Sequence, residues 1–134
     1  MKLTDVTPNL IVADMDRSAA FYKDVLGFSI VTTVPETAPF VFAWMQRDGV
    51  NEFLNSLAGM EDDISGLAKR PIGGTATMFF PVEPDGAGGI EEFFNEISAR
   101  ATVVMPLKDQ FYGMREFGVE DPDGYIIVFA QRIG

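Results

Sequence analysis

The 134-residue chain contains no cysteine and no histidine. Without cysteine it has no disulfide, no thiolate metal ligand and no cysteine nucleophile. Without histidine it has no Ser–His–Asp triad, no imidazole proton shuttle and no imidazole-bound metal. These two absences exclude a large part of hydrolytic and metal-dependent chemistry before any pattern along the chain is considered.

Basic residues are scarce as well. Ten Lys and Arg stand against 20 Asp and Glu, which gives a formal net charge of −10. Nucleic acids and anionic membrane surfaces are not expected partners, because both require clustered basic side chains. No apolar run approaches the ~18 residues of a membrane span, and residues 1–5 lack the apolar stretch of a signal peptide. We therefore expect a cytoplasmic protein whose charge favours cationic small molecules.

Hydrophobic periodicity predicts the same order of elements twice. In the first half, strands are expected over residues 3–13, 28–34, 40–46 and 50–57, with a helix over 17–26. In the second half, strands are expected over 75–82, 102–107, 113–120 and 125–131, with a helix over 90–100. The chain is thus predicted to be a single α+β domain of two tandem βαβββ modules, about 1–57 and 73–134, joined by a linker over 58–72.

Local signals support the expected ends of these elements. Asp14 offers an N-cap carboxylate before the first helix, and Gly27 stands where a glycine ends such a helix. Asp48-Gly49 is a hairpin signal, and Asp121-Pro122-Asp123-Gly124 is a turn signal. These motifs indicate the fold and carry no chemistry of their own.

Two longer stretches resemble a known family. Residues 8–28 (PNLIVADMDRSAAFYKDVLGF) and 112–125 (YGMREFGVEDPDGY) are similar to the two signatures of the vicinal oxygen chelate superfamily. That superfamily includes glyoxalases, extradiol dioxygenases, fosfomycin resistance enzymes and bleomycin resistance proteins, and the sequence is most similar to the last branch. Because each module has one helix to cover one face of its sheet, two such sheets side by side are expected to make a half-open, eight-stranded, barrel-like cup with the helices outside. The resemblance implies a homodimer in which cups form between modules of two chains.

The resemblance also locates the positions that would bind a metal. In metal-using members, His, Glu or Gln ligands come from the first and last strands of each module. The matching positions here are Thr7, Phe53, Thr77 and Val128, and none carries such a side chain. Glu52 is one residue out of register, so strand alternation points it to the opposite face. We therefore expect no metal and no other cofactor, and we lean against an enzymatic activity.

Without metal ligands, the side chains expected to line the cup are mainly apolar and aromatic. Trp44 is the best single candidate, as the only tryptophan of the chain. Alternation places Phe40, Phe42 and Trp44 on one strand face without saying which. Arg115 has an alternative role, which is to pair with Asp109, Glu116 or Glu120. The residues predicted to contact a ligand are Thr7, Trp44, Phe53, Thr77, Phe79, Tyr112, Arg115 and Val128.

Three hypotheses about function follow. The first is a metal-independent protein that sequesters a small molecule, such as a cationic aromatic compound, in the manner of bleomycin resistance. The second is a glyoxalase- or dioxygenase-like lyase or isomerase with an atypical site. The third is a regulatory module of the same fold whose cup is filled by its own Phe and Met side chains.

Overall fold

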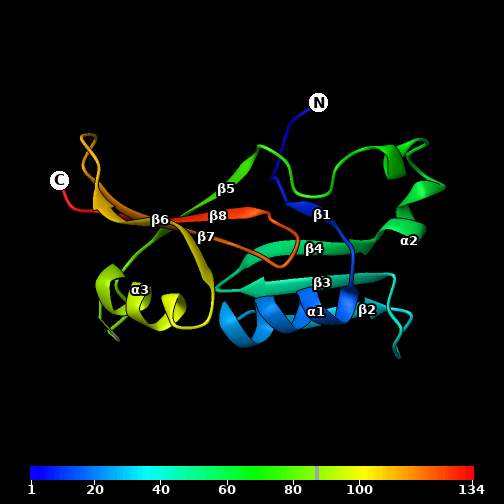
Figure 1. Cartoon of the computed structure of the whole chain (residues 1–134), viewed down its shortest axis with the longest axis horizontal. Coiled ribbons are helices and arrows are strands. Elements are labelled where there is room, and N and C mark those ends of the chain that lie inside the picture. The colour runs from blue at the N-terminus through cyan, green and yellow to red at the C-terminus, as the bar shows by residue number, and fades with distance from the viewer. Residues whose placement is uncertain (87) are drawn as a thin grey trace. The chain divides into compact units, whose positions relative to one another are not determined.

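A computed structural model of the chain describes residues 1–86 and 88–134 and divides into two compact units, Met1–Ile72 and Gly73–Gly134 (Figure 1). Each unit contains its own four-stranded mixed sheet. The fold is therefore α+β with two repeated modules, as predicted, and its strands form two separate four-stranded sheets. The expected cup stays a prediction.

The first unit begins with a β-strand and a helix and continues with three strands. Its strands are β1 (Asn9–Val12), β2 (Ser29–Val34), β3 (Phe42–Arg47) and β4 (Val50–Ser56). Its helical segments are α1 (Met15–Ala20), the π-helical η1 (Phe21–Val25), α2 (Leu57–Glu61) and the 3-10 helix η2 (Leu67–Lys69). The sheet order is β1-β4-β3-β2, with β1 parallel to β4. The expected linker is thus partly helical, and it belongs to the first compact unit.

The first helix begins and ends at the predicted signals. The side chain of Asp14 accepts a hydrogen bond from the backbone N–H of Arg17 at 3.0 Å, which satisfies one of the unpaired donors of the first turn. Gly27 follows the last turn with φ of 74°, a conformation that glycine adopts without a Cβ clash. The predicted helix over 17–26 is confirmed, although α1 starts two residues earlier.

The predicted strand over residues 3–13 is longer than the observed β1. β1 starts at Asn9, which pairs with Phe53 of β4. Pro8 contributes only its carbonyl, which accepts the N–H of Phe53 at 2.9 Å, and it has no N–H of its own to extend the ladder. Thr7 therefore lies before the strand rather than within it.

The first sheet has a face covered by helix and a face away from it. Leu10, Val12, Ala43, Met45 and Leu54 are buried on one face, where α1 contacts β3 and β4. A hydrogen bond of 2.6 Å from Nη1 of Arg47 to the carbonyl of Leu26 also joins this face to the helical segment. We call it the helix face and the opposite one the distal face. Because alternate residues share a face, Phe42, Trp44 and Phe53 are on the distal face.

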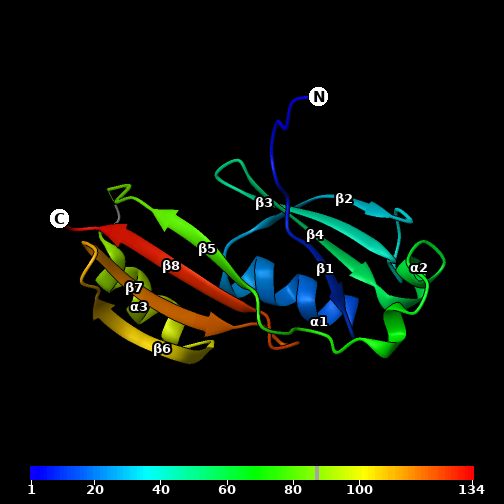
Figure 2. The same cartoon turned by 90° about the horizontal axis from the view of Figure 1, so that it is seen from above.

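The second unit repeats this arrangement. Its elements are β5 (Thr77–Val82), α3 (Ile90–Ser98), β6 (Thr102–Asp109), β7 (Met114–Glu120) and β8 (Ile126–Arg132). The sheet order is β5-β8-β7-β6, with β5 parallel to β8, which matches the first sheet strand for strand. Figure 2 shows α3 running along one side of this sheet.

Aromatic rings join α3 to one face of the second sheet, which we again call the helix face, and the opposite one is its distal face. The ring of Phe93 lies 4.9 Å from that of Phe129, and the ring of Phe94 lies 5.1 Å from that of Phe117. Phe117 is fully buried. This packing confirms the apolar face predicted for the helix over 90–100.

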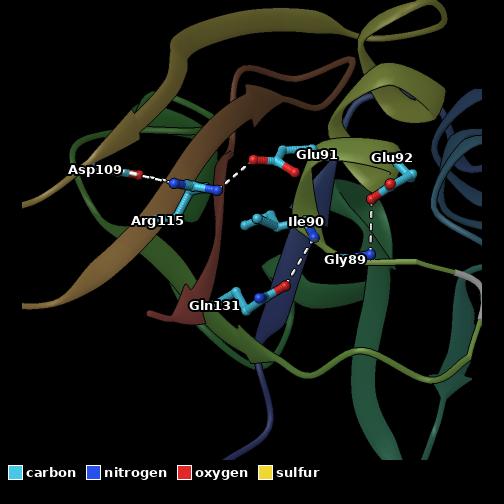
Figure 3. A network of polar contacts seen from close by, with 7 residues as sticks. All are labelled: Gly89, Ile90, Glu91, Glu92, Asp109, Arg115 and Gln131. Atoms are coloured by element: carbon cyan, nitrogen blue, oxygen red, sulfur yellow. Dashed lines mark hydrogen bonds and ion pairs between the residues drawn. The ribbon is translucent and has the colours of Figure 1, made fainter. Parts of the chain in front are cut away.

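Two polar contacts secure the start of α3. Glu92 accepts a hydrogen bond from the N–H of Gly89, and Gln131 of β8 accepts one from the N–H of Ile90, at 2.8 and 2.9 Å (Figure 3). Both satisfy donors that the first helical turn leaves unpaired. In the described residues, no helix is long and apolar enough to span a membrane.

Candidate functional site

Three half-buried aromatic side chains lie together on the distal face of the first sheet. Trp44 and Phe53 are cross-strand partners on β3 and β4, and their ring centroids are 6.2 Å apart with the planes nearly perpendicular. The ring centroid of Phe42 lies 5.2 Å from that of Phe53. We call Phe42, Trp44 and Phe53 the aromatic cluster.

A neighbouring amide fixes the orientation of the tryptophan. Oδ1 of Asn51 accepts hydrogen bonds from Nε1 of Trp44 at 2.8 Å and from Nε2 of Gln46 at 2.9 Å. The indole donor is therefore satisfied within the protein, and its ring is held in place without help from a ligand. An ordered ring of this kind loses little conformational entropy when an aromatic molecule packs against it.

The same face carries a second pair of amides. Nδ2 of Asn55 donates to Oδ1 of Asn9 and, at 3.4 Å, to the carbonyl of Leu10. The polar side chains that these hydrogen bonds place beside the aromatic cluster are neutral amides. Reasoning from the sequence missed these amides; a usable signal was that Asn51 and Asn55 lie two residues on either side of Phe53, and therefore on its face.

Glu52 lies on the helix face, as its register predicts. Its cross-strand partner is Met45, which is fully buried on the α1 side, and Glu52 itself has 0% exposure. A carboxylate in this position cannot reach the distal face without a change of strand register. The prediction that Glu52 points to the face opposite Phe53 is therefore confirmed.

The four positions that match the superfamily's metal ligands do not fit a metal ion. Thr7 lies before β1, and Phe53 belongs to the aromatic cluster. Thr77 pairs with Ile126, and Val128 pairs with Phe79. Hydroxyls and hydrocarbons are not the ligands that bind Zn²⁺, Fe²⁺ or Ni²⁺ in proteins. In the described part of the chain, no three or more Asp or Glu side chains are grouped so as to hold a metal ion.

The distal face of the second sheet combines apolar side chains with one buried carboxylate. Strand pairing places Thr77, Phe79 and Val128 on this face, and Phe79 is 50% exposed. Glu116 shares the face and is only 3% exposed. Its Oε2 accepts a hydrogen bond of 2.9 Å from the hydroxyl of Tyr112, and this bond raises the pKa of that tyrosine.

Arg115 lies on the other side of the second sheet. It pairs with Gln131, whose side chain reaches the start of α3, and its guanidinium binds Asp109 of β6 and Glu91 of α3 (Figure 3). Hydrogen bonding to the guanidinium lowers the pKa of Asp109. Arg115 therefore has the alternative role that the sequence suggested, which is to pair with Asp109. We do not propose it as a ligand contact.

Most of the candidate residues fall into two groups, one in each unit, whereas Thr7 and Arg115 belong to neither group. Trp44 and Phe53 meet in the first, while Thr77, Phe79 and Val128 share a face in the second. Tyr112 contacts Glu116, which sequence reasoning considered only as a partner for Arg115.

Comparison with known proteins agrees with the repeated βαβββ architecture. Residues 4–129 match the family model of the Glyoxalase/Bleomycin resistance protein/Dioxygenase superfamily. The chain therefore belongs to this superfamily. Proteins described as "Bleomycin resistance protein" from Geobacillus stearothermophilus and Staphylococcus aureus are each 33% identical to it over 135 residues, covering 94% of this chain and 95% of theirs.

Solved structures show the same fold. A protein of unknown function from Agrobacterium tumefaciens superposes with a TM-score of 0.76 at 23% identity, covering 99% of this chain and 97% of that one. A glyoxalase-related enzyme from Fulvimarina pelagi superposes with a TM-score of 0.74 at 21% identity, over 97% and 89% of the two chains. At this level of identity the likeness concerns the fold alone.

Proposed function

We propose that this protein binds and sequesters a planar, cationic aromatic small molecule without chemically altering it. The observation that carries the proposal is the aromatic cluster, which lies on the sheet face away from α1 with Trp44 held by Asn51. The 33% identity to proteins described as bleomycin resistance proteins supports a binding role of this type.

The physical contributions to such binding are modest individually and add up. Packing of an aromatic ligand against aromatic side chains contributes ~0.5–1.5 kcal/mol per pair beyond the burial of area. A positive charge over an indole face adds ~0.5–2 kcal/mol. The net charge of −10 attracts cations over longer distances.

The residues that the sequence predicted as further ligand contacts stay part of the proposal: Thr7, Thr77, Phe79, Tyr112 and Val128. We also propose that the protein is a homodimer and that it acts in the cytoplasm.

The proposal is tested by isothermal titration calorimetry with two probes, metal-free bleomycin and 9-aminoacridine, which is a planar cation at neutral pH. We expect saturable binding by the wild-type protein. Trp44→Leu should weaken it by about 10-fold or more, which is the loss of roughly 1.4 kcal/mol of ring contact. The matched control is Phe21→Leu, which removes an aromatic ring from the helical segment that follows α1.

The calorimetric results distinguish a failure of the proposed function from a failure of the proposed binding surface. A wild-type protein that binds neither probe would contradict the proposed function. Equal effects of Trp44→Leu and Phe21→Leu would show that the aromatic cluster is not the binding surface. Light scattering of the purified protein tests the homodimer independently, because a monomer at the concentrations used for calorimetry would exclude it.

A further inference from the structure

Two amide side chains lie at one end of the aromatic cluster and hold each other in a fixed orientation. Gln46 on β3 and Asn51 on β4 are cross-strand partners, next to the Trp44–Phe53 pair and on the same face. An indole N–H only donates hydrogen bonds, so the atom of Asn51 that lies 2.8 Å from Nε1 of Trp44 is the oxygen Oδ1. The same oxygen accepts a hydrogen bond from Nε2 of Gln46 at 2.9 Å. The tryptophan therefore sets the orientation of both amides.

This orientation leaves one donor and one acceptor unused. Nδ2 of Asn51 and Oε1 of Gln46 have no hydrogen-bond partner among the described residues. Both side chains are only partly buried, and neither atom belongs to the buried polar atoms that lack a partner. The two atoms are thus open to water, and a ligand can replace that water without entering the interior of the protein.

The other end of the aromatic cluster is less accessible. Asn55, the cross-strand partner of Phe42, is only 5% exposed. Its Nδ2 already donates to Oδ1 of Asn9 and to the carbonyl of Leu10. A polar group of a ligand on the cluster is therefore expected at the end formed by Gln46 and Asn51.

The two unused atoms define the chemistry of that polar group. It has to donate a hydrogen bond to Oε1 of Gln46 and to accept one from Nδ2 of Asn51. A carboxamide carries both functions on one carbon, whereas an ammonium group has no acceptor and a carboxylate has no donor. A ligand without a matching group displaces the water and leaves both atoms unpaired, which is unfavourable.

We propose that Gln46 and Asn51 determine ligand specificity by recognising a carboxamide attached to the aromatic system that packs on the aromatic cluster. Oε1 of Gln46 accepts an N–H of the ligand, and Nδ2 of Asn51 donates to its carbonyl. This inference rests on the proposed function, because it assumes an aromatic ligand on the cluster. It adds the chemical class of the ligand's substituent, and every residue that it uses belongs to the first unit.

The test compares probes that share one ring system. They are 9-aminoacridine, the positional isomers of 9-aminoacridine carboxamide, and the N,N-dimethyl derivative of the tightest-binding isomer, which has the carbonyl but no N–H. Calorimetric affinities are measured for the wild type, for Gln46→Met and for Gln110→Met. Gln46→Met removes the acceptor and leaves Oδ1 of Asn51 bonded to Trp44. Gln110→Met is the matched control, because it makes the same change at a partly buried position of the second unit.

The wild type should bind at least one carboxamide isomer about 10-fold more tightly than 9-aminoacridine, as expected for two added hydrogen bonds. In Gln46→Met this advantage should fall below about threefold, whereas Gln110→Met should keep it. The dimethyl derivative should lose most of the advantage in the wild type.

The results distinguish this inference from the proposed function. If 9-aminoacridine binds but no carboxamide isomer has an advantage, or if the advantage persists in Gln46→Met, the assignment of specificity is wrong and the proposed function stands. If the wild type binds none of the probes, both are wrong.

A second measurement on the wild type does not depend on the folding of a variant. A hydrogen bond donated by Nδ2 of Asn51 moves its N–H signals downfield in NMR spectra. The carboxamide should therefore shift these signals further downfield than 9-aminoacridine does, while the side-chain amide of Asn95, exposed on α3, should respond little to either probe. Equal shifts of the Asn51 signals with both probes would contradict the proposal.

Discussion

The two sheets share one strand order but differ on their distal faces. The first carries aromatic rings surrounded by neutral amides whose hydrogen bonds are made within the protein. The second carries fewer rings and a buried carboxylate, one oxygen of which has no hydrogen-bond partner among the described residues. On the helix faces both sheets bury mainly apolar side chains against helix, although the first sheet also buries Glu52 there. The aromatic rings and their amide partners are thus the feature of the distal face that the second repeat lacks.

The largest effect should come from the helix face. Phe117 is fully buried and its ring contacts Phe93, Phe94 and Phe129. We expect Phe117→Ala to lower the free energy of unfolding by ~3–5 kcal/mol. Phe53→Ala, on the distal face of the first sheet, removes a half-buried ring and should lower it by about half as much or less.

Urea denaturation of the two variants measures this difference. If Phe53→Ala destabilises the protein as much as Phe117→Ala, then the aromatic cluster is a structural core rather than a binding surface. The contrast between the helix and distal faces would then have to be abandoned.

A smaller effect is expected at the two helix starts, which are capped in different ways. Asp14 caps α1 through its own side chain, whereas the start of α3 has two acceptors, Glu92 and Gln131. Asp14→Ala should lower the unfolding free energy by ~1 kcal/mol. Glu92→Ala should have a smaller effect, because Gln131 still satisfies the N–H of Ile90. Thermal denaturation checks the order, and a larger loss for Glu92→Ala would contradict it.

The smallest effect concerns the ion pair on the helix face of the second sheet. Arg115 lowers the pKa of Asp109 below its ordinary value of 3.8 in the folded protein. The resulting stabilisation is therefore present above that ordinary value and is lost as the pH falls through the lowered pKa. Because Asp109 is more than half exposed, solvent screens the pair and the effect is small.

Comparison of the wild type with Asp109→Asn measures this contribution. The difference in unfolding free energy should be constant from about pH 7 to about pH 5 and should shrink below about pH 4. A difference that grows as the pH falls would have the wrong sign for a carboxylate with a lowered pKa.

Sequence patterns predicted those features that depend on neighbours along the chain. Asp14 and Gly27 bound the first helix as expected, because caps act over a few residues. Strand alternation correctly predicted that Glu52 points away from the distal face. The extent of the first strand was wrong, because Pro8 interrupts the ladder and pairing with β4 starts only at Asn9.

The polar partners of the site could not be predicted in the same way. Asn51 on β4 accepts a hydrogen bond from the indole of Trp44 on the neighbouring strand β3. Glu116 accepts a hydrogen bond from Tyr112, which lies in the turn before β7. Such choices depend on register, rotamers and burial, which periodicity does not specify. Alternation groups Trp44 with Phe42, but the position of α1 decides that their face is the distal one.

Binding of planar cations at the distal face of the first sheet is tested most directly by NMR spectroscopy. The chain has a single tryptophan, so its indole N–H gives one resolvable signal that reports on the aromatic cluster. We expect 9-aminoacridine at saturation to shift this signal and the side-chain amide signals of Asn51 and Asn55, while the signals of buried α1 residues move little. Saturable binding that leaves the Trp44 signal in place and shifts residues of the helix face would contradict it.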